Sequence, residues 1–101
     1  MSEAGAPYSA DEVGKRVRAL RAALGYESQA AFAEAIGAKP GEIGAWESGG
    51  RRPGIPKAEA MVKRFRITLD WLFLGDPSKL PYELAVSLAD KQSALSASDR
   101  D

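Results

Sequence analysis

The sequence contains no cysteine and no histidine, which together exclude disulfides, thiolate nucleophiles, imidazole bases and the common zinc sites. It has no apolar run near the ~18 residues needed to cross a bilayer, and its N-terminus lacks the layout of a signal peptide. Lys+Arg and Asp+Glu balance at 14 each, so the net charge gives no sign of a nucleic acid partner. These absences predict a soluble cytoplasmic protein that uses no membrane, metal or cofactor.

The length and composition indicate one small domain. With 101 residues, 45% of them hydrophobic and 28% charged, the chain can form one packed core and has little room for a second. Positive charge is concentrated in residues 51–66, which hold six basic residues and one acidic residue. Because salt screens a charge beyond roughly 8 Å, this segment either binds phosphate locally or forms a solvated helix face.

The first helix is marked at both ends. Ser9 and Glu12 have the spacing of a capping box, in which each side chain satisfies a helix-terminal N–H. Gly25 can supply the left-handed residue that ends a helix. Between them, apolar residues recur on a helical period at Val13, Val17, Leu20 and Leu24.

Two short helices are predicted next, separated by a tight turn at Gly37. Ser28 can cap the first of them, and Pro40 suits the first position of the second because its missing N–H would be unpaired there anyway. Gly41 and Gly44 each cost about 1 kcal/mol relative to Ala, so packing must hold this helix in shape. The predicted buried residues of the pair are Phe32, Ala33, Ile36, Ile43 and Trp46.

The second half of the chain begins with a loop over residues 49–54. A helix from Pro56 follows, then a short apolar helix over residues 69–74 that we expect to plug the core. Residues 81–89 predict a sixth, short helix, on a pattern of only two apolar residues, Leu84 and Leu88. The expected organisation is therefore a flexible lead-in (1–8), an all-α domain of five helices (9–76), a possible C-terminal helix (77–89) and a flexible tail (90–101).

Several spacings agree with one known family. The segments are Gly25-Tyr26-Glu27-Ser28-Gln29-Ala30-Ala31-Phe32-Ala33-Glu34-Ala35-Ile36-Gly37, then Ile43, Trp46-Glu47-Ser48-Gly49-Gly50-Arg51-Arg52-Pro53 and Leu69-Asp70-Trp71-Leu72-Phe73-Leu74-Gly75-Asp76. Over about residues 12–76 the chain resembles the phage repressor and Cro-type, or XRE-like, helix-turn-helix domains. The resemblance implies a five-helix DNA-binding domain that places its third helix, residues 39–48, in the major groove.

The resemblance also implies roles for particular residues. Gln29 matches the glutamine that bonds a DNA phosphate at the start of the second helix. Arg21 and Glu47 match a salt bridge that orients the recognition helix, and an exposed pair of this kind contributes only about 0–1 kcal/mol. Arg51 and Arg52 lie where the family's loop runs beside the DNA backbone, with solvation as the alternative role.

At the positions that read base edges the chain departs from the family pattern. Those positions hold Pro40, Gly41 and Ala45, which cannot form the bidentate hydrogen bonds that distinguish base pairs. Lys39 could reach phosphate or guanine. Glu42 could accept from cytosine or repel the backbone, so we expect weak sequence readout.

The leading hypothesis is a bacterial or phage transcriptional regulator, not an enzyme, that binds double-stranded operator DNA as a homodimer. The alternative is a helix-turn-helix domain repurposed for protein–protein contacts. Dimer contacts, inferred by resemblance, would lie near the C-terminal end of the five-helix unit. Leu80, Leu84 and Leu88 either extend that surface or pack back on the domain's own core.

Overall fold

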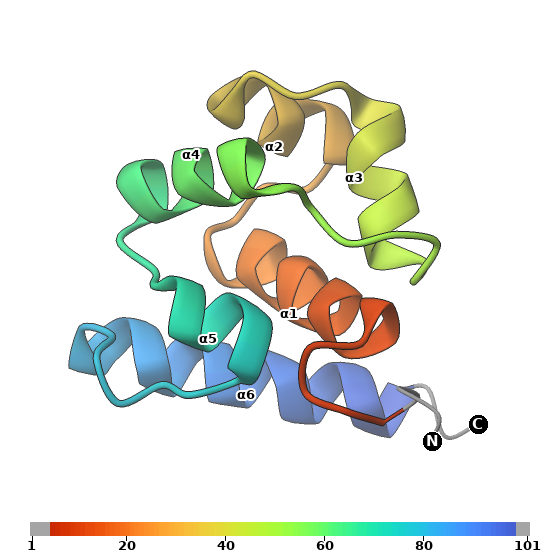
Figure 1. Ribbon diagram of the computed structural model, residues 1–101. Helices are drawn as coiled ribbons and strands as arrows, with labels where there is room; N and C mark the ends of the chain where they lie inside the picture. The colour runs from red at the N-terminus through yellow and green to blue at the C-terminus, as the bar shows by residue number, and fades with distance from the viewer. Residues whose placement is uncertain (1–4, 99–101) are drawn as a thin grey trace.

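Six helices and no strand occur in residues 5–98, the part of the chain that the computed structural model describes (Figure 1). The all-α prediction is therefore confirmed. The helices are α1 (Ala10–Ala23), α2 (Gln29–Ile36), α3 (Pro40–Glu47), α4 (Ile55–Phe65), α5 (Leu69–Leu74) and α6 (Tyr82–Ser98).

Side-chain caps begin three of the helices, two of them at the serines that the sequence predicts. The hydroxyls of Ser9, Ser28 and Thr68 each accept a hydrogen bond from a backbone N–H in the first turn, at 3.2, 3.1 and 2.9 Å. Gly37 and Gly75 end α2 and α5 at φ of 69° and 76°, a left-handed conformation that glycine adopts without strain. Local sequence signals thus account for these five helix ends.

Helix α1 lies at the centre of the fold and packs against α3, α5 and α6. The core is formed mainly by the fully buried residues Val13, Val17, Leu20, Phe32, Ile43, Trp46, Met61, Trp71, Leu72 and Leu88. In α5, Trp71 and Leu72 are buried, but Leu69 and Leu74 are 41% and 54% exposed. The prediction that α5 plugs the core is thus correct for one of its faces only.

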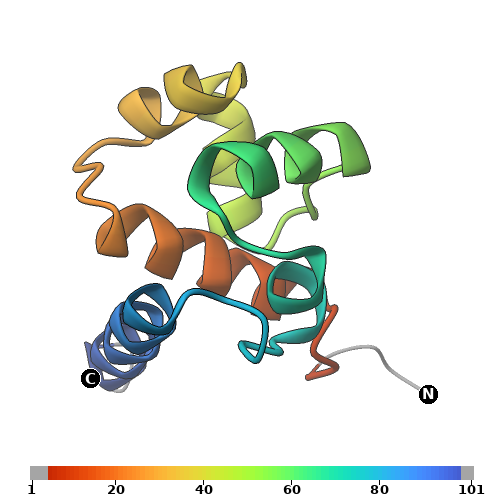
Figure 2. The ribbon, with the colours of Figure 1, turned by 90° about the vertical axis from the view of Figure 1, so that its left-hand side faces the viewer.

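Helix α6 is much longer than expected. The sequence analysis ends this helix at residue 89 and treats residues 90–101 as a flexible tail, whereas α6 continues to Ser98; residues 99–101 lie outside the described part. In Figure 2 α6 is seen nearly along its axis, lying against α1. Leu80 and Leu88 are buried in the domain's own core and Leu84 packs against it, so Leu80 and Leu88 are not free for a dimer interface.

The N-terminal segment is attached to the domain just before α1. Of the predicted lead-in, residues 1–4 lie outside the described part, and Gly5–Tyr8 form turns. The Pro7 carbonyl accepts a hydrogen bond from Arg16 at 2.6 Å, and the Tyr8 carbonyl accepts one from Arg52 at 3.1 Å. Pro7 and Tyr8 are therefore hydrogen-bonded to the domain. The flexibility of the lead-in stays a prediction.

Candidate nucleic-acid interface

Helices α2 and α3 are joined by the tight turn that the sequence predicts. After the left-handed Gly37, the Ala38 N–H donates to the Ala33 carbonyl at 2.9 Å, and α3 begins at Pro40. Lys57, at the start of α4, donates from Nζ to the Gly37 carbonyl at 2.7 Å. This contact places a positive charge at the carboxyl end of α2, where the helix dipole favours it.

Close packing against α1 fixes the position of α3. Ile43 and Trp46 bury one side of α3, and a Cβ at Gly14 of α1 would collide with the Trp46 carbonyl oxygen. Gly14 therefore sets how closely the two helices approach. The sequence analysis did not single out Gly14. The available signal was a glycine inside a strong helical pattern.

A hydrogen-bond network around Glu47 joins α1, α2 and α3. Arg21 donates from Nε to Glu47 Oε2 at 2.7 Å and from Nη2 to Oε1 at 3.1 Å, forming the ion pair that the sequence predicts. Gln29, the first residue of α2, donates from Nε2 to Glu47 Oε1 at 3.2 Å. The two ion-pair side chains are only 17% and 7% exposed. The hydrogen bonds that Arg21 donates to the Glu47 carboxylate raise the pKa of Arg21 above its ordinary value.

The front of α3 presents little hydrogen-bonding chemistry. Lys39, Pro40 and Gly41 are exposed, Ala45 is half-buried, and a Cβ at Gly41 would meet nothing within 4 Å. Glu42 Oε1 accepts a hydrogen bond from the Lys39 backbone N–H at 3.1 Å, so this carboxylate caps the start of α3. Lys39 is the remaining long polar side chain at this end of the helix.

The loop between α3 and α4 lies beside the start of α1. Arg51 and Arg52 are both exposed, and Pro53 is buried. A Cβ at Gly49, whose φ is 80°, would collide with the Asp11 carboxylate, so the loop backbone passes directly over the first turn of α1. Gly49 thus lies against α1 at one end of the loop, and Pro53 is buried at the other. The two exposed arginines project from between these packed ends.

The basic segment 51–66 does not form one stripe. Helix α4 runs away from the loop, so its last turn lies far from α3 (Figure 1). In that turn Lys63 pairs with Glu59 at 3.8 Å, and the Arg64 guanidinium lies 5.6 Å from the Phe65 ring centroid. Near α3, only the loop arginines and Lys57 contribute positive charge from this segment.

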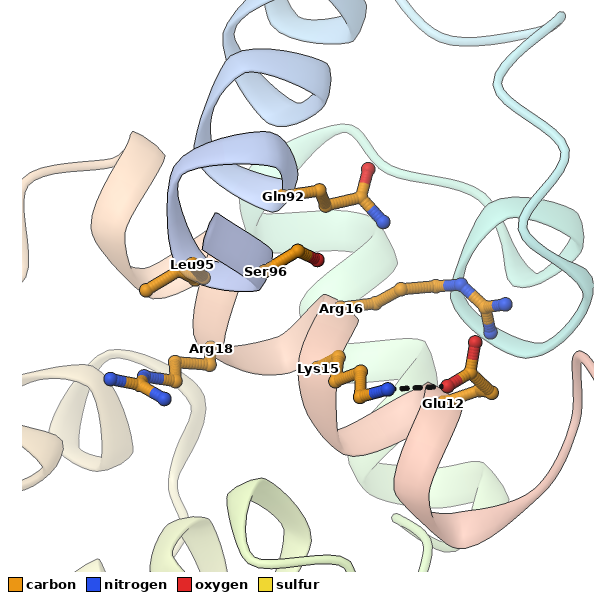
Figure 3. Close-up of a pocket in the computed structure, with 7 residues that line it drawn as sticks. All are labelled: Glu12, Lys15, Arg16, Arg18, Gln92, Leu95 and Ser96. Atoms are coloured by element: carbon orange, nitrogen blue, oxygen red, sulfur yellow. Dashed lines mark hydrogen bonds and ion pairs between the residues drawn. The ribbon is translucent and has the colours of Figure 1, made fainter. Parts of the chain in front are cut away.

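A hollow of about 150 Å³ lies between α1 and α6, on the side of α1 that α6 covers (Figure 3). It is lined by Glu12, Lys15, Arg16, Arg18, Gln92, Leu95 and Ser96. Burial lowers the pKa of Arg16, whose Nη1 donates to the carbonyls of Pro7 and Leu72. Among the described residues no group of three carboxylates could hold a metal ion. In residues 5–98 every helix is too short or too polar to span a bilayer.

The fold and this surface define a small helix-turn-helix domain, with α2 and α3 as the two helices of the motif. A family model described as Helix-turn-helix matches residues 17–72, more than half of the chain. The chain belongs to this family, which confirms the resemblance to phage repressor and Cro-type domains and supports a DNA-binding role. Searches of curated proteins and of solved structures find no significant match.

Proposed function

We propose that this protein is a transcriptional regulator that binds double-stranded DNA with α3 in the major groove. The observation that carries the proposal is the placement of positive charge at both ends of the exposed side of α3. Lys39 precedes its first turn, and Arg51 follows its last. An eight-residue helix is about 12 Å long, close to the major-groove width of about 12 Å. Cations at its two ends therefore match phosphates on the two sides of the groove.

Gln29 is suited to a third phosphate contact. Its amide nitrogen carries two hydrogens, one of which it donates in the hydrogen bond to Glu47. The second hydrogen remains for a phosphate oxygen at the amino end of α2, where the helix dipole favours negative charge. Glu47 then fixes both the orientation of this amide and the end of the recognition helix. Pro40, Gly41 and Ala45 leave methyl and backbone contacts for the bases between the phosphates.

The regulator acts as a homodimer on paired half-sites, as the family resemblance implies. Since Leu80 and Leu88 belong to the core, the dimer contacts use other side chains at the same end of the molecule. Leu74 and Tyr82 are exposed apolar side chains there, at 54% and 81%. Sedimentation equilibrium with and without operator-length duplex measures the stoichiometry, and one protomer per duplex at saturation would contradict the dimer.

Binding to duplex DNA at increasing salt tests the proposal. Each phosphate contact contributes about 0.9 to the negative slope of log affinity against log salt. In the homodimer, Lys39→Gln with Arg51→Gln removes two such contacts from each protomer and should reduce the slope by roughly 4. The matched control is Lys63→Gln with Arg64→Gln, which removes the same charge at the far end of α4 and should leave the slope nearly unchanged. Equal effects of the two double variants would place the interface elsewhere. Absence of duplex binding at low salt would favour the protein–protein alternative.

A further inference from the structure

The loop that carries Arg51 and Arg52 is attached to the segment preceding α1. Arg52 donates from Nη1 to the Tyr8 carbonyl at 3.1 Å, joining residues that are 44 positions apart. Tyr8 and Arg52 also line one open apolar hollow of about 360 Å³, together with Pro53, Gly54, Ile55 and Phe73. At the other end of the loop, Gly49 lies so close to α1 that a Cβ there would collide with the Asp11 carboxylate.

The segment preceding α1 is itself anchored in the core. Arg16 is only 6% exposed, and its Nη1 lies 2.6 Å from the Pro7 carbonyl and 3.0 Å from the Leu72 carbonyl. Figure 3 shows the Arg16 side chain reaching from α1 towards α5. Two consecutive carbonyls, of Pro7 and Tyr8, are therefore held by two arginines, one buried and one on the loop. A displacement of this segment would move the Arg52 guanidinium with it.

The two loop arginines differ in their surroundings. The Arg51 side chain is exposed and makes no hydrogen bond or ion pair with residues 5–98. Arg52 already has a carbonyl partner, and an arginine loses part of its conformational freedom when its planar fork is held in one place. Before any ligand binds, the Arg52 guanidinium is thus held by a carbonyl, whereas the Arg51 side chain has no hydrogen-bond partner within residues 5–98.

We propose that Arg52 is a positioning residue that fastens the loop to the Tyr8 carbonyl, and that Arg51 is the phosphate ligand of this loop. The inference rests on the proposed DNA binding. Residues 7 and 8 act as a fixed anchor, so that the loop is already in place and its ordering is not required when DNA binds. Such preorganisation strengthens binding by reducing the entropy lost on association.

A double-mutant cycle on duplex affinity tests this assignment. Arg52→Ala is made in the full chain, in a variant that starts at Pro7 after an initiator Met, and in one whose first residue is Ser9 because its initiator Met has been removed. In the full chain and the Pro7 variant, Arg52→Ala should weaken binding roughly 3- to 10-fold per bound protomer, the contribution of one hydrogen bond. In the Ser9 variant, which lacks the Tyr8 carbonyl, the same substitution should change affinity less than about 2-fold.

The salt dependence supplies an independent readout in the full chain, whether or not the Ser9 variant folds. In the homodimer, Arg51→Ala removes one phosphate contact from each protomer and should reduce the slope by roughly 2, whereas Arg52→Ala should leave it nearly unchanged. An Arg52→Ala variant that loses the same slope, with equal weakening in all backgrounds, would make Arg52 a direct phosphate ligand and overturn the proposal. Failure of the unmodified protein to bind duplex would instead overturn the proposed function.

Discussion

Removing the Glu47 carboxylate is the sharpest test of how the recognition helix is held. The sequence predicts an exposed ion pair with Arg21, but the structure buries both side chains, at 17% and 7% exposure, and adds Gln29 as a third partner. Burial raises the expected coupling energy of the pair, because the two side chains are shielded from solvent and their hydrogen bonds are charge-assisted. We therefore expect the Arg21–Glu47 pair to exceed the roughly 0–1 kcal/mol of a surface pair.

The expected loss in the free energy of unfolding is estimated from the hydrogen bonds that Glu47→Ala removes. A hydrogen bond to a charged group contributes about 1.5–3 kcal/mol, and Glu47→Ala removes two from Arg21 and one from Gln29. Arg21 keeps the carbonyls of Tyr26 and Glu27 at 3.1 and 3.2 Å, so it is not left without partners. Because Arg21 keeps these partners, the loss of stability should stay well below the sum of three such bonds. We expect about 2–4 kcal/mol for Glu47→Ala and an Arg21–Glu47 coupling energy of about 1.5–3 kcal/mol. Because the pKa of Arg21 is raised, its contribution is fully present below its unfolded-state pKa and falls only as pH rises through the folded-state value.

The assay is urea unfolding, followed by tryptophan fluorescence, of the unmodified chain, Arg21→Ala, Glu47→Ala and the double variant. The matched control is the same cycle on Glu59 and Lys63, whose side chains are 63% and 74% exposed at 3.8 Å. That surface pair should show a coupling of about 0–0.5 kcal/mol. If the Arg21–Glu47 coupling is no larger than the control value, the reasoning from burial is wrong.

Three further predictions concern the core, the last helix and the readout of DNA. Trp71→Ala should lower the free energy of unfolding by about 3–5 kcal/mol, and a mutant with unchanged thermal stability would contradict the burial of this side chain. Leu88→Ala should cost about 2–5 kcal/mol in one cooperative transition, whereas separate melting of α6 would show that it is not part of the core. With Pro40, Gly41 and Ala45 at the base-reading positions, competition of a selected operator against random duplex should give a specificity ratio near 10³, the bottom of a usual range of roughly 10³–10⁷. A ratio near the top would show that these residues do not weaken readout.

The sequence predicted those parts of the fold that depend on neighbouring residues. Caps such as Ser28 act over three residues, and the apolar stripe of α1 repeats within one helix, so both are visible in a short window. The length of α6 was missed because serine and alanine dominate its second half, and the composition resembled a disordered tail. Alanine is nevertheless the best helix former, and Leu95 continues the stripe of Leu84 and Leu88 on a helical period.

Contacts between distant residues could not be predicted in this way. The ion pair of Arg21 with Glu47 was expected only because the spacing resembles a known family, and nothing local indicated that Gln29 would join it. The bond from Arg52 to the Tyr8 carbonyl links two surface segments through the backbone of one partner, so no side-chain pattern identifies it. Such contacts depend on how the helices pack around α1.

The role of Glu42 shows how a local contact limits what the recognition helix can read. The sequence left open an acceptor for cytosine, but Glu42 lies three residues after Lys39 and bonds its backbone N–H. A contact over three residues requires little additional ordering of the chain, and it satisfies a helix-terminal donor that would otherwise lack a partner. Using Glu42 for base readout would break this cap, and the carboxylate would also approach the negatively charged DNA. In the proposed complex, discrimination between DNA sequences must then come mainly from Lys39, from methyl and backbone contacts along α3, and from sequence-dependent DNA shape.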